Sequence, residues 1–278
     1  MCRAVARRRH AVGGVKDSRP FLFVHGAWHG PWCWQEHWTA HIERSGHRAE
    51  TIQLSAHGRL GDRRRIWSTI REHVAEVSER AASLGPRTVL VGHSMGGLIV
   101  QRALEGSEAA GAVLIASIPR RGLLPAALRL LRRLPVPMLH AMCTVNMWPI
   151  VGSEALARRA FYSAMTPDDT VASTFARLQN ESFRSFVSTI VRPPRPSRVS
   201  TPVHVIAAEL DGFFTLAEQR DLAHAYGVEP YVLAGSGHNV MLDGSWVEAA
   251  DEVLRWATTL DADAHRVPTP EPSPRVGP

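Results

Sequence analysis

Cysteine, lysine and long apolar runs are all scarce in this sequence of 278 residues. The three cysteines, Cys2, Cys33 and Cys143, are odd in number and widely spaced, and they match no metal-binding or C-x-x-C pattern. We therefore expect reduced thiols, no metal site and a cytoplasmic protein. No apolar run approaches the length that spans a membrane, and no apolar stretch follows the basic N-terminus. Neither stable membrane insertion nor a signal peptide is therefore predicted.

The sequence is basic overall, with a formal net charge of +6, but its basic residues are unevenly placed. Residues 1–19 contain six arginines and lysines against one aspartate, whereas residues 261–278 contain two arginines against three acidic residues. The segment between them is close to neutral, which favours a solvated extension over a nucleic-acid-binding arm. We expect residues 1–19 and the proline-rich residues 261–278 to be disordered, and we expect no nucleic-acid partner.

Hydrophobic residues make up 45% of the sequence, which predicts a globular chain with a sizeable core. Short apolar runs, typical of buried parallel strands, alternate with helical patterns. Strands are predicted at residues 20–24, 50–54, 88–91, 112–116, 203–207 and 231–233, and helices at residues 34–45, 66–84, 95–106, 217–226 and 245–260. This predicts an α/β fold, a mostly parallel sheet with helices on both faces, formed by residues 20–118 and 201–260. The alternation is absent over residues 119–200, which predicts an inserted helical cap.

The segment 89–100 combines an apolar strand pattern, a glycine-flanked serine and the start of an apolar helix. Its centre, Gly92-His93-Ser94-Met95-Gly96, matches the G-x-S-x-G pattern of a nucleophile elbow. In such a turn the serine is held in a strained conformation with its hydroxyl exposed, and a Cβ at either glycine would clash. Ser94 is therefore the candidate nucleophile.

Two further candidates follow later strands, at the edge where the carboxyl ends of parallel strands meet. Asp211 comes after the fifth predicted strand and His238 after the sixth, so the order Ser, Asp, His is that of α/β-hydrolases. Glu209 is an alternative acid, but Asp211 has the better spacing from the strand end. Asp243 is interpreted as part of the start of the last helix.

Each of these residue types has a task in acyl transfer. A serine hydroxyl is a weak nucleophile at neutral pH, and a histidine can take its proton and return it to the leaving group. A carboxylate fixes the imidazole tautomer and stabilises the imidazolium. The tetrahedral intermediate needs backbone donors for its oxyanion, and the amides of Ala27 and Met95 are the candidates. This chemistry requires no metal and no organic cofactor.

The stretch 23–34, FVHGAWHGPWCW, together with the elbow and Gly237-His238, resembles the α/β-hydrolase superfamily. The first stretch is similar to the branch that holds plant-type methyl esterases and hydroxynitrile lyases alongside bacterial carboxylesterases. In that branch the residue after His-Gly supplies an oxyanion amide, which implies this role for Ala27. The catalytic acid there ends a Gly-x-x-Asp-like segment; here Ala208 replaces the glycine and Asp211 stands at the acid position.

Three functions are compatible with these motifs. The favoured hypothesis is hydrolysis of a small or medium apolar carboxylic ester, lactone or thioester through an acyl-enzyme, with an ester-like small molecule as the partner. The second is a lyase of the hydroxynitrile type, but such enzymes use a lysine near the leaving cyanide, and this chain has no lysine after Lys16. The third is a small-molecule receptor that keeps the fold and the triad. Dehalogenases and epoxide hydrolases need an aspartate at the elbow, where Ser94 stands here.

Several other side chains have structural interpretations. His25 is expected to shape the loop under the oxyanion site, and His93 to pack beside the elbow. Most of the tryptophans at positions 28, 32, 34 and 38 are expected in core or cap contacts, with the lining of a pocket mouth as the alternative. Five leucines of the inserted segment are expected to face an acyl pocket and the neighbouring arginines to face water, with a membrane-surface helix as the alternative. These leucines are Leu123, Leu124, Leu128, Leu131 and Leu134. Further apolar lining is predicted from Met138, Met142, Trp148, Phe161, Phe175, Phe183 and Phe186.

Overall fold

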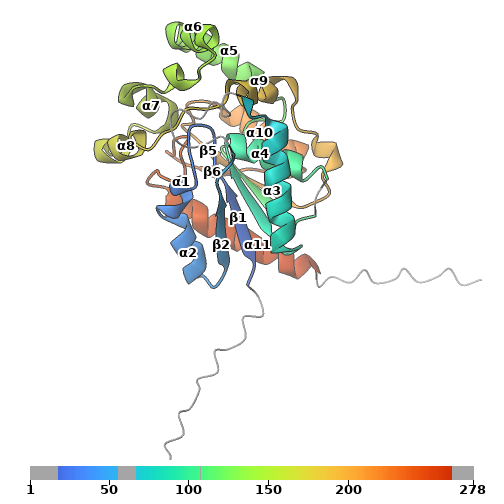
Figure 1. Cartoon of the computed structure of the whole chain (residues 1–278). Helices are drawn as coiled ribbons and strands as arrows, with labels where there is room; N and C mark the ends of the chain where they lie inside the picture. Colours follow the sequence, from blue (N-terminus) through green and yellow to red (C-terminus); the bar gives the residue numbers. More distant parts are fainter. Residues whose placement is uncertain (1–17, 56–66, 107, 265–278) are drawn as a thin grey trace, which may run out of the picture.

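The computed structural model describes residues 18–55, 67–106 and 108–264, with side chains up to residue 260 (Figure 1). The expectations for residues 1–17 and 265–278 lie outside this part of the chain. In the described residues, six strands form one sheet: β1 (Pro20–Val24), β2 (Arg48–Ile52), β3 (Val89–His93), β4 (Gly111–Ile115), β5 (Val203–Ala208) and β6 (Tyr231–Leu233). All neighbouring strands are parallel, in the order β2-β1-β3-β4-β5-β6.

The central strands are buried along their length, as their continuous apolar sequences predict. β1 and β3 are aligned so that Val24 pairs with Gly92, and the loops that follow both strands therefore emerge at one edge of the sheet. The neighbouring strand β2 begins at Arg48, opposite Pro20, two residues before the predicted 50–54. β2 is only partly buried and contains polar residues, so its sequence lacks the apolar run that marks the central strands.

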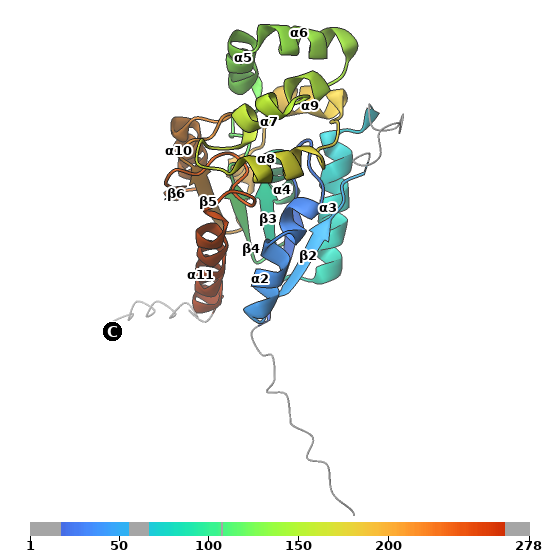
Figure 2. The same ribbon diagram turned by 90° about the vertical axis from the view of Figure 1, so that its left-hand side faces the viewer.

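Helices cover both faces of the sheet. α2 (Trp38–Arg44) packs with α11 (Trp246–Ala264), and α3 (Ile70–Leu84) packs with α4 (Met95–Ala103). The two pairs lie on opposite faces (Figures 1 and 2), while α10 (Leu216–Ala225) contacts β5. α11 extends beyond its expected end at residue 260. A parallel sheet with helices on both faces confirms the predicted α/β fold.

Two helix boundaries depart from the prediction for local reasons. The segment 34–45 forms two helices, α1 (Trp32–Gln35) and α2, because His37 leaves the helical conformation with φ −135°. α3 begins directly after Thr69, because the Thr69 hydroxyl accepts from the Glu72 amide and the Glu72 carboxylate accepts from the Thr69 amide at 2.7 Å. This capping box satisfies free amides of the first turn and marks the start of the helix.

The described chain between β4 and β5 contains helices and no strand. They are α5 (Leu124–Arg133), α6 (Pro135–Thr144), α7 (Glu154–Phe161), α8 (Asp168–Phe175) and α9 (Phe183–Val191), with 3₁₀ turns at Trp148–Ile150 and Pro196–Arg198. Figure 2 shows this insertion above the carboxyl ends of the strands, with α6 at its outer end, beyond α7 and α9. None of the helices in the described residues has the length and hydropathy that a bilayer crossing requires.

Candidate active site

Ser94 stands at the junction between β3 and α4, where the chain turns sharply. Its φ of 52° lies in the left-handed region, which residues with a side chain rarely adopt. The Ser94 amide donates to the Ile115 carbonyl at 3.1 Å, and the Ser94 carbonyl accepts from the Ile118 amide at 3.1 Å. The strained residue is therefore held on both sides by β4 and the loop that follows it.

The glycines on either side make this turn possible, as the sequence predicts. A Cβ on Gly92 would lie 2.6 Å from the Gly96 carbonyl oxygen, and a Cβ on Gly96 would collide with the Val24 carbonyl oxygen. Because each obstacle is backbone, neither position can hold a larger residue without displacing β1 or α4.

The structure brings the three candidate side chains together. The imidazole of His238 lies between the other two, with Nε2 3.0 Å from Ser94 Oγ and Nδ1 2.8 Å from Asp211 Oδ2. Since the carboxylate accepts a hydrogen bond from Nδ1–H, Nε2 is the acceptor for the serine hydroxyl. The side chains of His238 and Asp211 are 2% and 0% exposed, so the pair is shielded from water. This is the geometry of a Ser–His–Asp relay.

Backbone amides hold Asp211 in place. Its Oδ1 accepts from the amides of Phe213 and Phe214 at 2.7 and 3.0 Å, which leaves Oδ2 for the imidazole. The alternative acid, Glu209, is exposed and accepts from the Gly235 amide at 2.8 Å, at the turn after β6. Of the two carboxylates, Asp211 is therefore the one that pairs with the imidazole.

Aromatic rings enclose the imidazole of His238. The ring centroids of His93 and Phe213 both lie 4.8 Å away, and those of Phe214 and Phe161 lie 5.5 and 6.2 Å away. His93 Nε2–H donates to the His238 carbonyl at 2.9 Å. Burial, reinforced by neighbouring imidazoles, lowers the pKa of His93 well below its usual value. His93 is therefore neutral at neutral pH and packs beside the elbow as predicted.

Ala27 and Met95 both line the space in front of Ser94. Neither of their amides donates a hydrogen bond to another residue in the described part of the chain. Met95 begins α4, where unpaired amides and the helix dipole favour negative charge. The two amides therefore stay candidates for an oxyanion hole.

His25 shapes the loop below this space, which was the structural role expected for it. Its Nδ1–H donates to the Gly26 carbonyl at 2.9 Å, and its Nε2 accepts from the Leu54 amide at 3.3 Å. Both ring nitrogens are occupied by backbone groups, so the fully buried imidazole fixes the path of the chain before Ala27.

A second histidine, His29, links the loop of Ala27 to the loop of His238. Its Nδ1–H donates to the Ala27 carbonyl at 2.8 Å, and its Nε2 accepts from the Asn239 side-chain amide at 3.1 Å. No sequence motif predicted a role for His29 or Asn239. The only available signal was that Asn239 directly follows the candidate base.

The inserted helix α7 ends against the same histidine loop. The Phe161 carbonyl accepts from the Asn239 amide at 2.8 Å, and the Phe161 ring stacks on that of His238 with an interplanar angle of 26°. Phe161 was predicted to line an acyl pocket. It instead holds the loop that carries the base.

Two further glycines allow α7 to approach so closely. A Cβ on Gly212, in the loop of the acid, would lie 2.6 Å from the Ala160 carbonyl oxygen. A Cβ on Gly237 would lie 2.6 Å from the Ser163 amide nitrogen. Both obstacles are backbone atoms of the insertion, so the loops of the acid and the base pack directly on it.

Asp243 also links the loop of His238 to the insertion, through hydrogen bonds to both. Its Oδ2 accepts from the Gly237 amide at 2.7 Å, and its Oδ1 accepts from the Thr166 hydroxyl at 2.9 Å. Asp243 does precede α11, as predicted, and the residue is buried, with 5% of its surface exposed. It braces the loop beside His238 and forms no part of the relay in the described structure.

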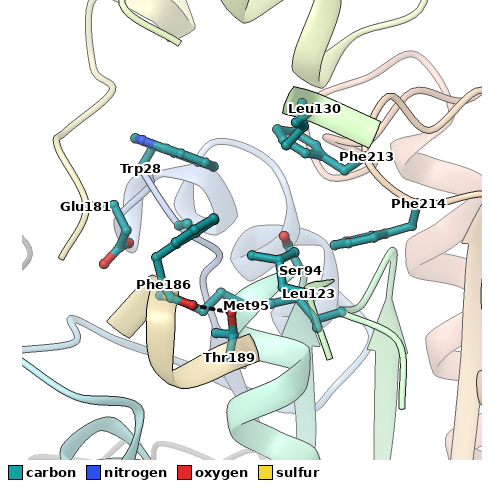
Figure 3. Close-up of a pocket in the computed structure, with 12 residues that line it drawn as sticks. Trp28, Ser94, Met95, Leu123, Leu130, Glu181, Phe186, Thr189, Phe213 and Phe214 are labelled. Atoms are coloured by element: carbon teal, nitrogen blue, oxygen red, sulfur yellow. Dashed lines mark hydrogen bonds between the residues drawn. The ribbon is translucent and has the colours of Figure 1, made fainter. Parts of the chain in front are cut away.

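Ser94 lines an apolar pocket that is partly open to solvent (Figure 3). Figure 3 shows Ser94 between the rings of Phe186 and Phe214. The core supplies Ala27, Trp28, Ser94, Met95, Ile118, Phe213 and Phe214, and the insertion supplies Leu123, Leu130, Glu181, Phe186 and Thr189. A lining of this composition suits an apolar group. In the described residues, no three His, Cys, Asp or Glu side chains cluster as a metal site requires.

Most of the apolar residues predicted to line the pocket from segment 138–186 lie elsewhere. Of the seven, Phe186 alone lines the described pocket. Trp148 and Phe175 pack on each other with ring centroids 6.1 Å apart, and Met142 is 53% exposed. Their helical spacing marked apolar faces, but it could not show which neighbour each face packs against.

The leucines of α5 and the tryptophans near β1 divide between pocket, core and surface. Leu123 lines the pocket as expected, whereas Leu124 and Leu128 are each 48% exposed. Leu130, which was not among the leucines predicted to face the pocket, also lines it. Trp34 and Trp38 are fully buried in the core, Trp28 lines the pocket, and Trp32 lies under the Arg177 guanidinium, 4.4 Å from the ring centroid.

The profile of the alpha/beta hydrolase family matches residues 21–256. The chain belongs to this family. Solved structures share the fold of this alpha/beta hydrolase. The methylesterase MES16 from Arabidopsis is 21% identical with a TM-score of 0.66, over 87% of this chain and 99% of that chain. Polyneuridine aldehyde esterase is 18% identical with a TM-score of 0.63, over 88% of this chain and 100% of that chain.

Several relatives found by sequence are named as esterases, and others are named as norfluorocurarine synthases. "Probable esterase PIR7A" of Oryza sativa subsp. indica is 36% identical over 110 residues, 38% of this chain and 41% of the relative. "Methyl jasmonate esterase 1" of Vitis vinifera is 36% identical over 92 residues, 32% of this chain and 35% of the relative. The aligned part of this chain thus spans less than half the length of these curated relatives. The predicted resemblance to the branch of plant-type methyl esterases is confirmed.

Proposed function

We propose that this alpha/beta hydrolase cleaves small or medium apolar carboxylic esters, lactones or thioesters through an acyl-enzyme on Ser94. The observation that carries the proposal is the relay from Asp211 through His238 to Ser94, with Nε2 3.0 Å from the hydroxyl, beside an apolar pocket. The esterases among its relatives support the same reaction class.

In this mechanism Ser94 Oγ attacks the carbonyl carbon while its proton passes to His238 Nε2. The imidazolium returns that proton to the leaving alcohol or thiol as the bond to the acyl carbon breaks, and the acyl group stays on Ser94. The same imidazole then deprotonates water, which attacks the acyl carbon and releases the acid. Asp211 stabilises the imidazolium in both halves of the reaction.

The amides of Ala27 and Met95 hold the oxyanion of each tetrahedral intermediate. Loss of one such donor typically costs about 3–4 kcal/mol of transition-state stabilisation. The links from His29 to both Ala27 and Asn239 support this role, because they hold the oxyanion loop in register with the loop of the base.

Residues 119–200 serve in this proposal as a helical cap that selects the acyl or alkoxy group. Five of its side chains line the pocket, so its packing limits the size of the bound group. We also propose a cytoplasmic location, which is compatible with the free thiols of Cys33 and Cys143. Burial raises the pKa of the Cys33 thiol, so this cysteine is unreactive.

The test is a series of p-nitrophenyl esters of graded acyl length, with thioesters and lactones beside them. Ser94→Ala should lower kcat by at least about 10⁴-fold because it removes the nucleophile. Ser188→Ala, which changes a half-buried serine of α9 that does not line the described pocket, should stay within about twofold of the wild type.

Three outcomes would contradict the proposal. Ester cleavage that persists in Ser94→Ala would exclude the serine mechanism. Release of cyanide from mandelonitrile, lost in Ser94→Ala, would favour the lyase. Tight binding of an ester that is not turned over would favour a receptor.

A further inference from the structure

Helices α5 and α6 expose a concentration of large apolar side chains. Of the twelve large apolar side chains that are exposed in the described residues, six lie between positions 124 and 145. They are Leu124 (48%), Leu128 (48%), Val136 (74%), Leu139 (53%), Met142 (53%) and Val145 (46%). Clustered exposure of this kind marks an interaction site more often than a free surface.

The packing of the cap does not require this exposure. α5 already turns Ala126, Ala127 and Leu130 inward, and α6 turns Met138 and Ala141 inward. Leu124 and Leu128, four residues apart, form a second apolar row on the outer side of α5. The outer row is therefore additional to the face that stabilises the cap.

The same segment carries positive charge without any acidic residue. Residues 119–153 contain five arginines and no aspartate or glutamate. Arg120 and Arg121 form ion pairs with Asp221 of α10, and Arg129 forms one with Glu218 of the same helix. The remaining two, Arg132 and Arg133, follow the exposed leucines of α5.

Arg132 and Arg133 are free to meet an external anion. Both side chains are exposed, and neither forms an ion pair with another described residue. They are the last two residues of α5, so positive charge lies at the junction with α6.

The shape of the molecule leaves this region accessible. Figures 1 and 2 both place α6 at the outer end of the insertion, on the side away from the sheet. A flat surface could therefore touch α5 and α6 together.

We propose that the α5–α6 surface, made of these six apolar side chains with Arg132 and Arg133, binds anionic lipid bilayers. Apolar side chains beside arginines match an interface of acyl chains and negatively charged headgroups. A second copy of the chain is a poorer match, because two copies of this surface would bring four guanidinium groups together. The binding goes beyond the proposed hydrolysis and does not depend on it.

The experiment is co-sedimentation of the full chain with vesicles of phosphatidylglycerol and phosphatidylcholine, and with vesicles of phosphatidylcholine alone. We expect pelleting with the anionic vesicles and a decrease at high salt. Each arginine near such a surface contributes roughly fivefold to partitioning, so Arg132→Glu/Arg133→Glu should lower it by more than about tenfold. Val136→Ser/Leu139→Ser should lower it by about fivefold or more.

Matched controls separate this surface from other sources of binding. Arg8→Glu/Arg9→Glu makes the same change of charge in the basic N-terminal segment, and Val247→Ser removes an exposed apolar side chain of α11. Both should retain binding to a larger extent than the α5–α6 variants. Unchanged hydrolysis of a dissolved p-nitrophenyl ester by the α5–α6 variants would show that they are folded.

Failure of this proposal is distinct from failure of the proposed function. Ser94→Ala should pellet like the wild type, whether or not the chain is an esterase. No pelleting with anionic vesicles, or pelleting that the α5–α6 variants leave unchanged, would overturn the proposal. A dimer that Val136→Ser/Leu139→Ser dissociates, without vesicle binding, would assign the surface to a subunit interface and overturn it too.

Discussion

Strands β3 and β4 are buried along their whole length, whereas helices α5 and α6 of the insertion expose large apolar side chains. The core supplies every member of the relay from loops at one edge of the sheet. The insertion supplies none, but its helix α7 packs on the loops of both the acid and the base. The core thus positions the reacting groups, and the insertion shapes the pocket and steadies two of the loops that carry them.

The largest expected loss of kcat comes from changing a relay residue that the core supplies. Asp211→Asn should lower kcat by about 10⁴-fold, because an amide in place of the carboxylate no longer fixes the imidazole tautomer. Steady-state hydrolysis of a p-nitrophenyl ester by the wild type and by Asp211→Asn measures this loss of kcat.

Glu209→Gln is the matched control for that change. It alters the other carboxylate of the same loop, which is exposed and bonded to the Gly235 amide. It should keep kcat within about threefold of the wild type. A larger loss in Glu209→Gln than in Asp211→Asn would assign the acid to Glu209.

A smaller effect is expected from separating the insertion from the histidine loop. Gly237→Ala places a Cβ against the backbone of Ser163, so the loop or the end of α7 must move. A shift of about 1 Å in a catalytic group can cost about 100-fold, and we expect kcat to fall by about 10- to 100-fold with a smaller change in KM. Comparing kcat and KM, with circular dichroism to check folding, tests this.

Gly244→Ala is the control in the same stretch of chain. A Cβ at Gly244 meets nothing within 4 Å, so kcat should be unchanged. If Gly237→Ala were as active as Gly244→Ala, the insertion would have no part in positioning the base.

The smallest effect concerns the ion pair that joins the insertion to the core. Arg129 on α5 forms two hydrogen bonds with the Glu218 carboxylate on α10, at 2.8 and 2.6 Å. Burial alone would raise the pKa of Glu218, but the hydrogen bonds from Arg129 and Thr215 hold it below the usual value of 4.5. A lowered pKa in the folded state stabilises the protein above about pH 4.5, and this stabilisation is lost as the pH falls through the folded-state value.

Glu218→Gln should therefore lower the free energy of unfolding by about 1 kcal/mol at pH 7. Urea denaturation of both proteins at pH 7 and at pH 3 measures the difference. It should be smaller at pH 3 than at pH 7, because protonation of the wild-type carboxylate at low pH removes the stabilisation. A difference of equal size at both values would show that the charge of Glu218 is not responsible.

The parts of the fold that could be predicted are those that local sequence determines. Buried parallel strands are continuous apolar runs, so β1 and β6 were predicted at their observed residues and β3, β4 and β5 to within two residues. The elbow also has a local cause, since Gly92 and Gly96 are needed by the turn itself. Ser94, Asp211 and His238 followed from their places after strands, because parallel strands present their loops at one edge.

The parts that could not be predicted depend on contacts between distant segments. Phe161, His29 and Asn239 gain their roles from neighbours far along the chain, and no pattern around them marks this. The same holds for the insertion, where helical spacing predicts apolar faces but not their partners. Its outer leucines were expected in the pocket, and only the packing of α5 shows which of them face water.

The central claim is that Ser94 carries the acyl group during turnover, and intact-protein mass spectrometry tests it most directly. When a slowly released ester is mixed with the protein and the reaction is quenched in acid, one acyl group per chain should be found on the peptide of Ser94. It should form and decay at the rate of turnover and be absent from Ser94→Ala. Full turnover with no acyl group on Ser94, or with the group on another residue, would contradict the account.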